Sequence, residues 1–218
     1  MDSKQEVIQA IKLGDASKVR AVLDNDATAA FARDTNGVSA LMLALYFRQH
    51  GMVEMLHRAQ PDLDIFEAAS LGKADRVQEL INRDRSLASA WSPDGFTPLH
   101  LAAFFGQENS ARTLLENGAD PNAVAKNAMK VAPLHSAAAG RDVNIVRMLL
   151  EHGASPNARQ HGGWTPIHEA AQSGDRDMVD LLLKHGADPA AKNDAGVTAL
   201  DLAKQKGHAD LAERLSAE

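Results

Sequence analysis

A short motif that recurs at nearly constant spacing constrains the fold of this chain more than any other feature. The motif begins at residues 97, 132, 165 and 198, so its successive offsets are 35, 33 and 33 residues. Its versions read TPLHLAA, APLHSAA, TPIHEAA and a weaker TALDLA. A fixed period of this length indicates stacked supersecondary units, each of which buries its apolar face only against its neighbours. We therefore expect an elongated stack of small units.

Each unit is predicted to contain two helices joined by a turn. Thr97 or Thr165 can cap the first helix through its hydroxyl group, and proline follows at the first helical position, where its missing N–H group is harmless. The alanine pair gives this helix a thin face that a neighbouring helix can approach closely. The second helix carries leucine pairs at 114–115, 149–150 and 182–183, and glycine ends it at 118, 153 and 186.

These motifs resemble ankyrin repeats, whose period is about 33 residues and whose signature is nearly identical. Three units between about 94 and 194 resemble ankyrin repeats closely, and a truncated unit over 195–218 follows them. The resemblance implies an all-α ankyrin-repeat solenoid of helix–turn–helix units, with the first and last units acting as caps. It also implies a protein-binding role that uses a concave groove and the loop tips.

The first third of the chain contains degraded copies of the same unit. Residues 34–44 keep the loop and first helix but lose the proline and histidine, and residues 65–72 keep the alanine pair and the glycine. The aligned motif positions are Glu6, Ala40, Asp64, Pro98, Pro133, Pro166 and Ala199. We therefore expect one array over 1–218 with about seven units, at approximately 1–33, 34–61, 62–91, 92–124, 125–159, 160–192 and 193–218.

Three irregularities interrupt the predicted array. The offset between Ala40 and Asp64 is only 24 residues, which is too short for the usual protruding loop. We expect a direct helix-to-helix joint there, with a notch near 58–64. Gly140 lies one place before the expected glycine, with Arg141 in the expected place, and two extra residues enlarge the loop at 127–131.

Composition argues against several classes of function. The 218 residues include no cysteine, which excludes disulfides, thiolate catalysis and cysteine-bound zinc. A formal net charge of −6 argues against a nucleic-acid partner, because phosphate binding needs clustered lysine and arginine. No apolar run reaches membrane-spanning length, and the first residues lack an apolar secretion core. We therefore expect a cytoplasmic monomer that binds neither nucleic acid nor membrane.

The histidines and carboxylates do not form a recognisable reactive pattern. His100, His135 and His168 recur at the repeat spacing, which would place them about 10 Å apart in a stack of packed helices. One zinc ion cannot bridge that distance, because its bonds to nitrogen are about 2 Å long. We expect each imidazole to hydrogen-bond loop groups instead. No spacing suggests a catalytic triad or a phosphate-binding loop, so we predict no catalytic residues, metal or cofactor.

Large apolar side chains provide the candidate contact surface. In ankyrin-like units, the residues just before the Thr-Pro step and the pair after the alanines tend to face the concave groove, as the resemblance implies. These positions hold Tyr46, Phe47, Phe96, Phe104, Phe105, Met129, Val131 and Trp164. The side chains either bind a partner or lean on neighbouring helices and cover the alanine faces. Because neighbours on a helix lie about 100° apart, at least one of Phe104 and Phe105 should be exposed.

Two functions from different classes fit the sequence. The preferred interpretation is an adaptor, scaffold or inhibitor that binds a protein partner of unknown identity, not an enzyme. The alternative is an enzyme or small-ligand receptor with a cleft at the irregular joint over 58–64. Such a cleft needs convergent polar groups, and this segment offers Arg58, Gln60, Asp62 and Asp64.

Uneven capping predicts uneven stability along the stack. The fourth to sixth units have the strongest capping signals, whereas the first three lack the proline and histidine elements. Because coupling in such arrays is mainly between neighbours, a weak end can open separately. We expect amide hydrogen exchange to show residues 1–60 opening before residues 97–186. Equal protection in both segments would contradict this prediction.

Overall fold

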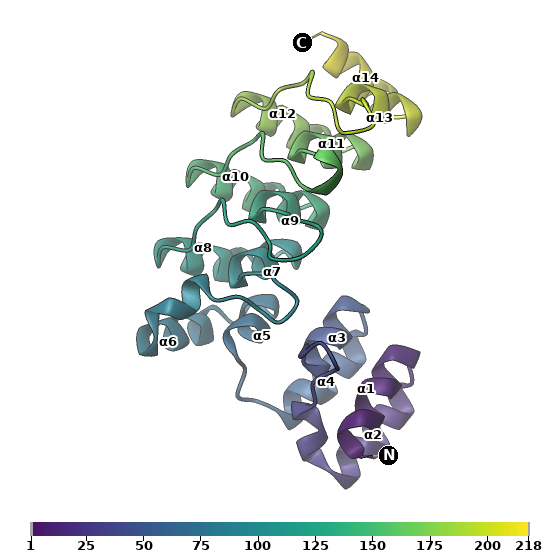
Figure 1. Ribbon diagram of the computed structural model, residues 1–218, viewed down its shortest axis with the longest axis vertical. Coiled ribbons are helices and arrows are strands. Elements are labelled where there is room, and N and C mark those ends of the chain that lie inside the picture. Colours follow the sequence, from purple (N-terminus) through teal and green to yellow (C-terminus); the bar gives the residue numbers. More distant parts are fainter. Residues whose placement is uncertain (1, 218) are drawn as a thin grey trace.

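The structure, a computed structural model, describes residues 2–217 as an elongated stack of helix pairs (Figure 1). Met1 and Glu218, the ends of the expected array, lie outside the described residues. Within the described part there are fourteen α-helices and no strand, and a single isolated β-bridge joins Arg33 and Ser39. The all-α solenoid expected from the sequence is confirmed.

The helices alternate between a first and a second member of each pair. The first helices are α1 (Ser3–Leu13), α3 (Ala40–Tyr46), α5 (Ile65–Ser70), α7 (Pro98–Phe104), α9 (Pro133–Gly140), α11 (Pro166–Ser173) and α13 (Ala199–Gln205). The second helices are α2 (Ala16–Asn25), α4 (His50–Ala59), α6 (Ala74–Arg83), α8 (Glu108–Glu116), α10 (Val143–Glu151), α12 (Arg176–Lys184) and α14 (Ala209–Ser216). Short 3-10 helices η1 (Ala27–Phe31), η2 (Arg85–Ser89) and η3 (His161–Gly163) lie in the connections. Each expected unit range contains one helix pair, while the unit boundaries themselves stay a prediction.

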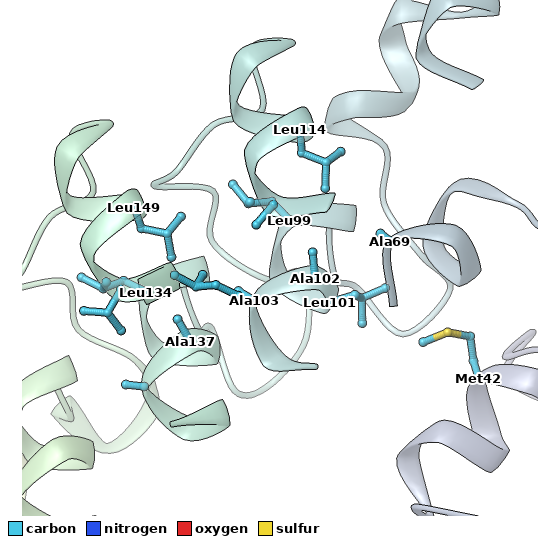
Figure 2. Packing of buried hydrophobic residues seen from close by; sticks show 14 of the residues in the cluster. Met42, Ala69, Leu99, Leu101, Ala102, Ala103, Leu114, Leu134, Ala137 and Leu149 are labelled. Carbon is cyan, nitrogen blue, oxygen red and sulfur yellow. The ribbon is translucent and has the colours of Figure 1, made fainter. Parts of the chain in front are cut away.

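Buried alanine and leucine side chains hold consecutive pairs together. Ala102 and Ala103 of α7 are completely buried, and the first helices pack on one another along the stack. Figure 2 shows the same arrangement in two successive units, with Leu99 beside Leu114 and Leu134 beside Leu149. The small alanine face therefore lets neighbouring first helices approach, while leucines fill the space between the two helices of a pair.

The 24-residue step produces the expected direct joint. Helix α4 ends at Ala59 and α5 begins at Ile65, so only residues 60–64 connect them. The second helices α2 and α4 pack together, as do α6 and α8, but α4 and α6 do not pack extensively in the described part of the chain. Figure 1 shows α4 set apart from α6 at this point. An ion pair between Arg33 Nη2 and Asp64 Oδ2 at 3.1 Å crosses the joint.

The displaced glycine at the end of α9 has a structural explanation. A Cβ atom added at Gly140 would lie 2.6 Å from the carbonyl oxygen of Phe104 and 3.0 Å from that of Ala103, so α9 approaches α7 too closely for any side chain there. Arg141 then takes the left-handed conformation that ends the helix, with φ of 60°. Glycine is thus required at position 140 for helix packing. The position that ends the helix is occupied by arginine, which adopts the left-handed conformation less readily than glycine does.

We expect these two positions to respond in opposite ways to substitution. Arg141→Gly should stabilise the fold by about 0.5–1 kcal/mol, because glycine adopts the left-handed conformation without steric cost. Gly140→Ala should cost more than about 1 kcal/mol, because the added methyl group meets the α7 backbone. Urea unfolding measures both changes.

Gly51 provides the matched control for the second substitution. It lies within α4, and a Cβ atom there would meet nothing within 4 Å. Gly51→Ala should therefore be neutral or stabilising by up to about 1 kcal/mol through helix propensity alone. A Gly140→Ala variant as stable as Gly51→Ala would show that α7 and α9 do not approach as closely as described.

Candidate binding groove

A groove of about 390 Å³ lies across the first helices and loops of the fourth to sixth units. Helices α3, α7, α9 and α11 and the loops that precede α7, α9 and α11 contribute to it. Its lining residues are Tyr46, Asp94, Phe96, His100, Leu101, Phe104, Met129, Val131, His135, Ser136, Ala139, Gln160 and Glu169. We call this surface the α7–α9 groove.

Five of the eight residues singled out in the sequence line the α7–α9 groove. They are Tyr46, Phe96, Phe104, Met129 and Val131. Phe104 is 39% exposed and Met129 57% exposed, whereas Val131 is buried. The expectation that Phe104 or Phe105 is exposed is therefore confirmed by Phe104. Whether these residues bind a partner stays a prediction.

The other three residues lie outside the groove lining. Phe47 follows α3 and is 50% exposed. Phe105 is half-buried, with its ring stacked on Tyr46 at 5.9 Å between centroids and edge-on to Phe104 at 5.2 Å. Trp164 is half-buried against the core, and its ring centroid lies 5.7 Å from that of His168. Phe105 and Trp164 thus have clear packing roles, whereas Phe104 presents a free face.

Tyr46 connects two units that are not consecutive. Its hydroxyl donates to Asp94 Oδ2 at 2.6 Å, which joins α3 of the second unit to the loop before α7 of the fourth. Burial, with the hydrogen bond to Asp94, raises the pKa of Tyr46, so its hydroxyl remains a donor. The direct joint brings these units close enough for this contact and gives the groove one wall from the N-terminal part of the stack.

Sequence reasoning missed the polar groups of the groove. Gln160 Nε2 donates to Glu169 Oε1 at 2.8 Å, and burial raises the pKa of Glu169 above its ordinary value. Leu101, Ser136 and Glu169 occupy the same position of the motif, between the histidine and the alanine pair. Because the three residues share this position on the first helix, the sequence alone could have placed them on the same face of the stack.

The repeated histidines join each unit to the loop of the next. His100 Nδ1 accepts from the N–H group of Thr97 at 3.2 Å, so Nε2 carries the proton and donates to the carbonyl of Val131 at 3.0 Å. His135 repeats the pattern with the N–H group of Ala132 and the carbonyl of Trp164. His168 repeats it with Thr165 and Val197. The expectation that these imidazoles hydrogen-bond loop groups is confirmed.

The polar groups at the irregular joint do not converge on an open cleft. Asp62 pairs with Arg76, Asp64 caps α5 by accepting from the N–H groups at its start, and the buried amide of Gln60 donates to Glu67 Oε2 at 3.2 Å. A hollow of about 320 Å³ touches this segment, but it lies between α2 and α4 and includes only Arg58 and Ala59 from 58–64. The expected notch is therefore a break in helix packing, and its polar side chains Gln60, Asp62 and Asp64 are bound to groups of α5 and α6.

The described residues contain neither a metal-binding cluster nor a membrane-spanning helix. Within 2–217, no three histidine or carboxylate side chains gather in a way that could hold a metal ion. No helix in the same range is both long enough and apolar enough to cross a bilayer.

Comparison with known proteins identifies the architecture. A family model described as ankyrin repeat matches residues 94–126, and one described as ankyrin repeats (3 copies) matches residues 134–218. Together these matches cover more than half of the chain. The helix–turn–helix stack is thus a repeat solenoid of the protein-binding class. The chain belongs to the ankyrin repeat family, whose repeats are protein–protein interaction modules.

Similar proteins align over a small share of their own length. The human "DNA-binding protein RFXANK" is 38% identical over 80 residues, which are 36% of this chain and 31% of that protein. "Ankyrin repeat and SAM domain-containing protein 6" of Danio rerio is 33% identical over 94 residues, or 38% of this chain and 13% of that protein. "Palmitoyltransferase akr1" of Schizosaccharomyces pombe is 42% identical over 60 residues, or 28% of this chain and 9% of that protein. The chain therefore spans less than a third of each of these relatives.

The buried histidines make stability depend on pH. Burial lowers the pKa of both His100 and His135 to about 4, whereas an unfolded histidine has a pKa of about 6.5. The unfolded state therefore binds more protons between these values. The free energy of unfolding is therefore highest above about pH 6.5. It decreases as the pH falls towards 4, by up to roughly 3 kcal/mol per histidine.

Urea unfolding at several pH values between 7 and 4 measures this loss. Glu67 and Glu169 act in the opposite direction, because burial raises their pKa values. The contribution of one histidine is therefore isolated by comparison with His135→Gln, whose stability should fall less steeply with acidification than that of the parent chain. Identical pH dependence in the two proteins would contradict the buried, neutral state of His135.

Proposed function

We propose that the chain is an adaptor, scaffold or inhibitor that binds a protein partner through the α7–α9 groove and the adjoining loop tips. The observation that carries this proposal is the pair of exposed apolar side chains, Phe104 and Met129, in one groove. Other lining residues, such as Leu101 and Val131, are buried. Large exposed apolar groups that lie together mark contact sites more often than isolated ones do. Aromatic side chains are also frequent anchors of binding energy.

The same groove has the dimensions of a binding site. Its volume of about 390 Å³ falls in the range of about 300–1,000 Å³ that is typical of ligand sites. The histidines that reach it are held by backbone groups on both ring nitrogens, so they position the loops rather than offer reactive atoms. These features favour recognition over catalysis.

The alternative of an enzyme or small-ligand receptor at the irregular joint has less support. Gln60, Asp62 and Asp64 are engaged with neighbouring side chains or with the start of α5. A catalytic site needs polar groups that converge on a substrate position. The absence of enzymatic activity, the cytoplasmic location, the monomeric state and the lack of a nucleic-acid partner stay predictions from the sequence.

Alanine substitution separates partner binding from packing. Phe104→Ala and Met129→Ala should each weaken capture of the protein partner, since a truncated anchor typically costs about 2 kcal/mol or more of binding free energy. Affinity purification from the source organism identifies the partner, and calorimetry measures its affinity for each variant. Trp164→Ala should instead lower the melting temperature, because its side chain packs against the core.

Phe31→Ala is the matched control. Phe31 ends η1, is 50% exposed and does not line the α7–α9 groove, so its loss should leave partner affinity unchanged. If Phe104→Ala and Met129→Ala retain full affinity while remaining folded, the groove is not the contact site.

A further inference from the structure

The α7–α9 groove has a strongly one-sided charge. Among the described residues that line it, Asp94 and Glu169 are the charged side chains, and no lysine or arginine accompanies them. The lining histidines, His100 and His135, are neutral in the fold because a backbone N–H group donates to Nδ1 of each. Neither carboxylate forms an ion pair within the described part of the chain.

Neutral donors hold both carboxylates in place. Asp94 accepts from the hydroxyl of Tyr46 at 2.6 Å and from Ser92 Oγ at 2.5 Å. Glu169 accepts from Gln160 Nε2 at 2.8 Å, and both acidic residues are only partly exposed. A partly buried carboxylate that lacks a cation gains more from an incoming positive charge than an exposed one does, because water screens it less.

The apolar part of the groove lies between these two acidic ends. The units stack in chain order, so Asp94 belongs to the fourth unit, Met129 and Val131 to the fifth, and Glu169 to the sixth. Phe96, Leu101 and Phe104 complete the apolar surface on the α7 side. A ligand that fills the groove therefore contacts an apolar surface flanked by a carboxylate at either end.

We infer that the α7–α9 groove takes a peptide segment of the partner in which a large aliphatic or aromatic side chain lies close to a lysine or arginine. The apolar side chain packs against the exposed Phe104 and Met129, and the cation pairs with Glu169. This inference rests on the proposed function and specifies the chemistry of the partner.

The same arrangement excludes other segments. An acidic peptide would place its charges beside Asp94 and Glu169, and that repulsion costs affinity. A purely apolar peptide would leave both carboxylates desolvated and without a cation. The net charge of −6 adds a long-range attraction for basic segments.

Selection from a random peptide library displayed on phage, with the full chain as bait, tests this chemistry. Enriched peptides should carry leucine, isoleucine, methionine or an aromatic residue within a few positions of lysine or arginine. Synthetic copies of the enriched peptides are then measured by fluorescence anisotropy. Replacing the basic residue of such a peptide with glutamine should weaken binding about tenfold or more.

Variants of the protein assign the cation to Glu169. Glu169→Gln keeps an oxygen that can accept from Gln160 but removes the charge, so we expect affinity for the basic peptide to fall about tenfold and its salt dependence to decrease. Glu151→Gln, which removes an exposed carboxylate of α10 that does not line the groove, is the matched control and should change nothing. Glu169→Lys should restore binding when the basic residue of the peptide is replaced with glutamate.

The outcomes separate the inference from the function beneath it. The charge assignment is wrong if the enriched peptides lack basic residues. It is also wrong if Glu169→Gln leaves peptide affinity unchanged while Phe104→Ala lowers it, and in that case the groove remains the contact site. If no peptide binds, but Phe104→Ala still abolishes binding of the folded partner, a peptide occupant is ruled out. If Phe104→Ala and Met129→Ala change the affinity for neither the peptides nor the partner, the proposed function itself is wrong.

Discussion

No helix pair in this chain can bury its apolar face alone, and every other property of the fold depends on contact between neighbours. Ala102 and Ala103 leave α7 thin enough for α9 to lie against it, and at Gly140 the approach is so close that no side chain fits. Because Gly140 is needed for this contact, the next residue, Arg141, ends the helix in the left-handed conformation. One packing requirement thus decides residue identity at several positions.

Two rows of hydrogen bonds reinforce this packing along residues 97–198. The histidines form one row, from each first helix to the following loop. Asparagines form the other: Asn122 Nδ2 donates to the carbonyl of Gly153 at 2.8 Å and its Oδ1 accepts from the N–H group of Ser155 at 2.8 Å. Asn157 repeats both contacts one unit later with Gly186 and Asp188. The histidine row satisfies buried ring nitrogens with loop backbone groups, and the asparagine row joins exposed loops of consecutive units.

The sequence was sufficient for those parts of the structure that local patterns determine. The motif period predicted the helix pairs, the spacing of the histidines predicted their separate loop contacts, and the short step before Asp64 predicted the direct joint. The groove was predicted only in part, because its lining depends on which side chains meet across units. Phe104 and Phe105 are neighbours in the chain, yet Phe105 stacks on Tyr46 and Phe104 does not. Glu169 was missed because leucine and serine hold its position in the fourth and fifth units, so the acidic side chain does not repeat along the groove.

The joint at residues 60–64 makes the shape of the groove depend on the curvature of the whole stack. Tyr46 lies on the N-terminal side of that joint, whereas the remaining lining residues, from Asp94 to Glu169, lie on the C-terminal side. The hydrogen bond from Tyr46 to Asp94 links the two sides of the joint, where α4 and α6 pack little on each other. Tyr46 thus contributes one wall of the groove from across the joint, so the width of the groove depends on the angle at residues 60–64. The placement of residues 2–59 relative to the rest of the stack is therefore part of what defines the binding surface.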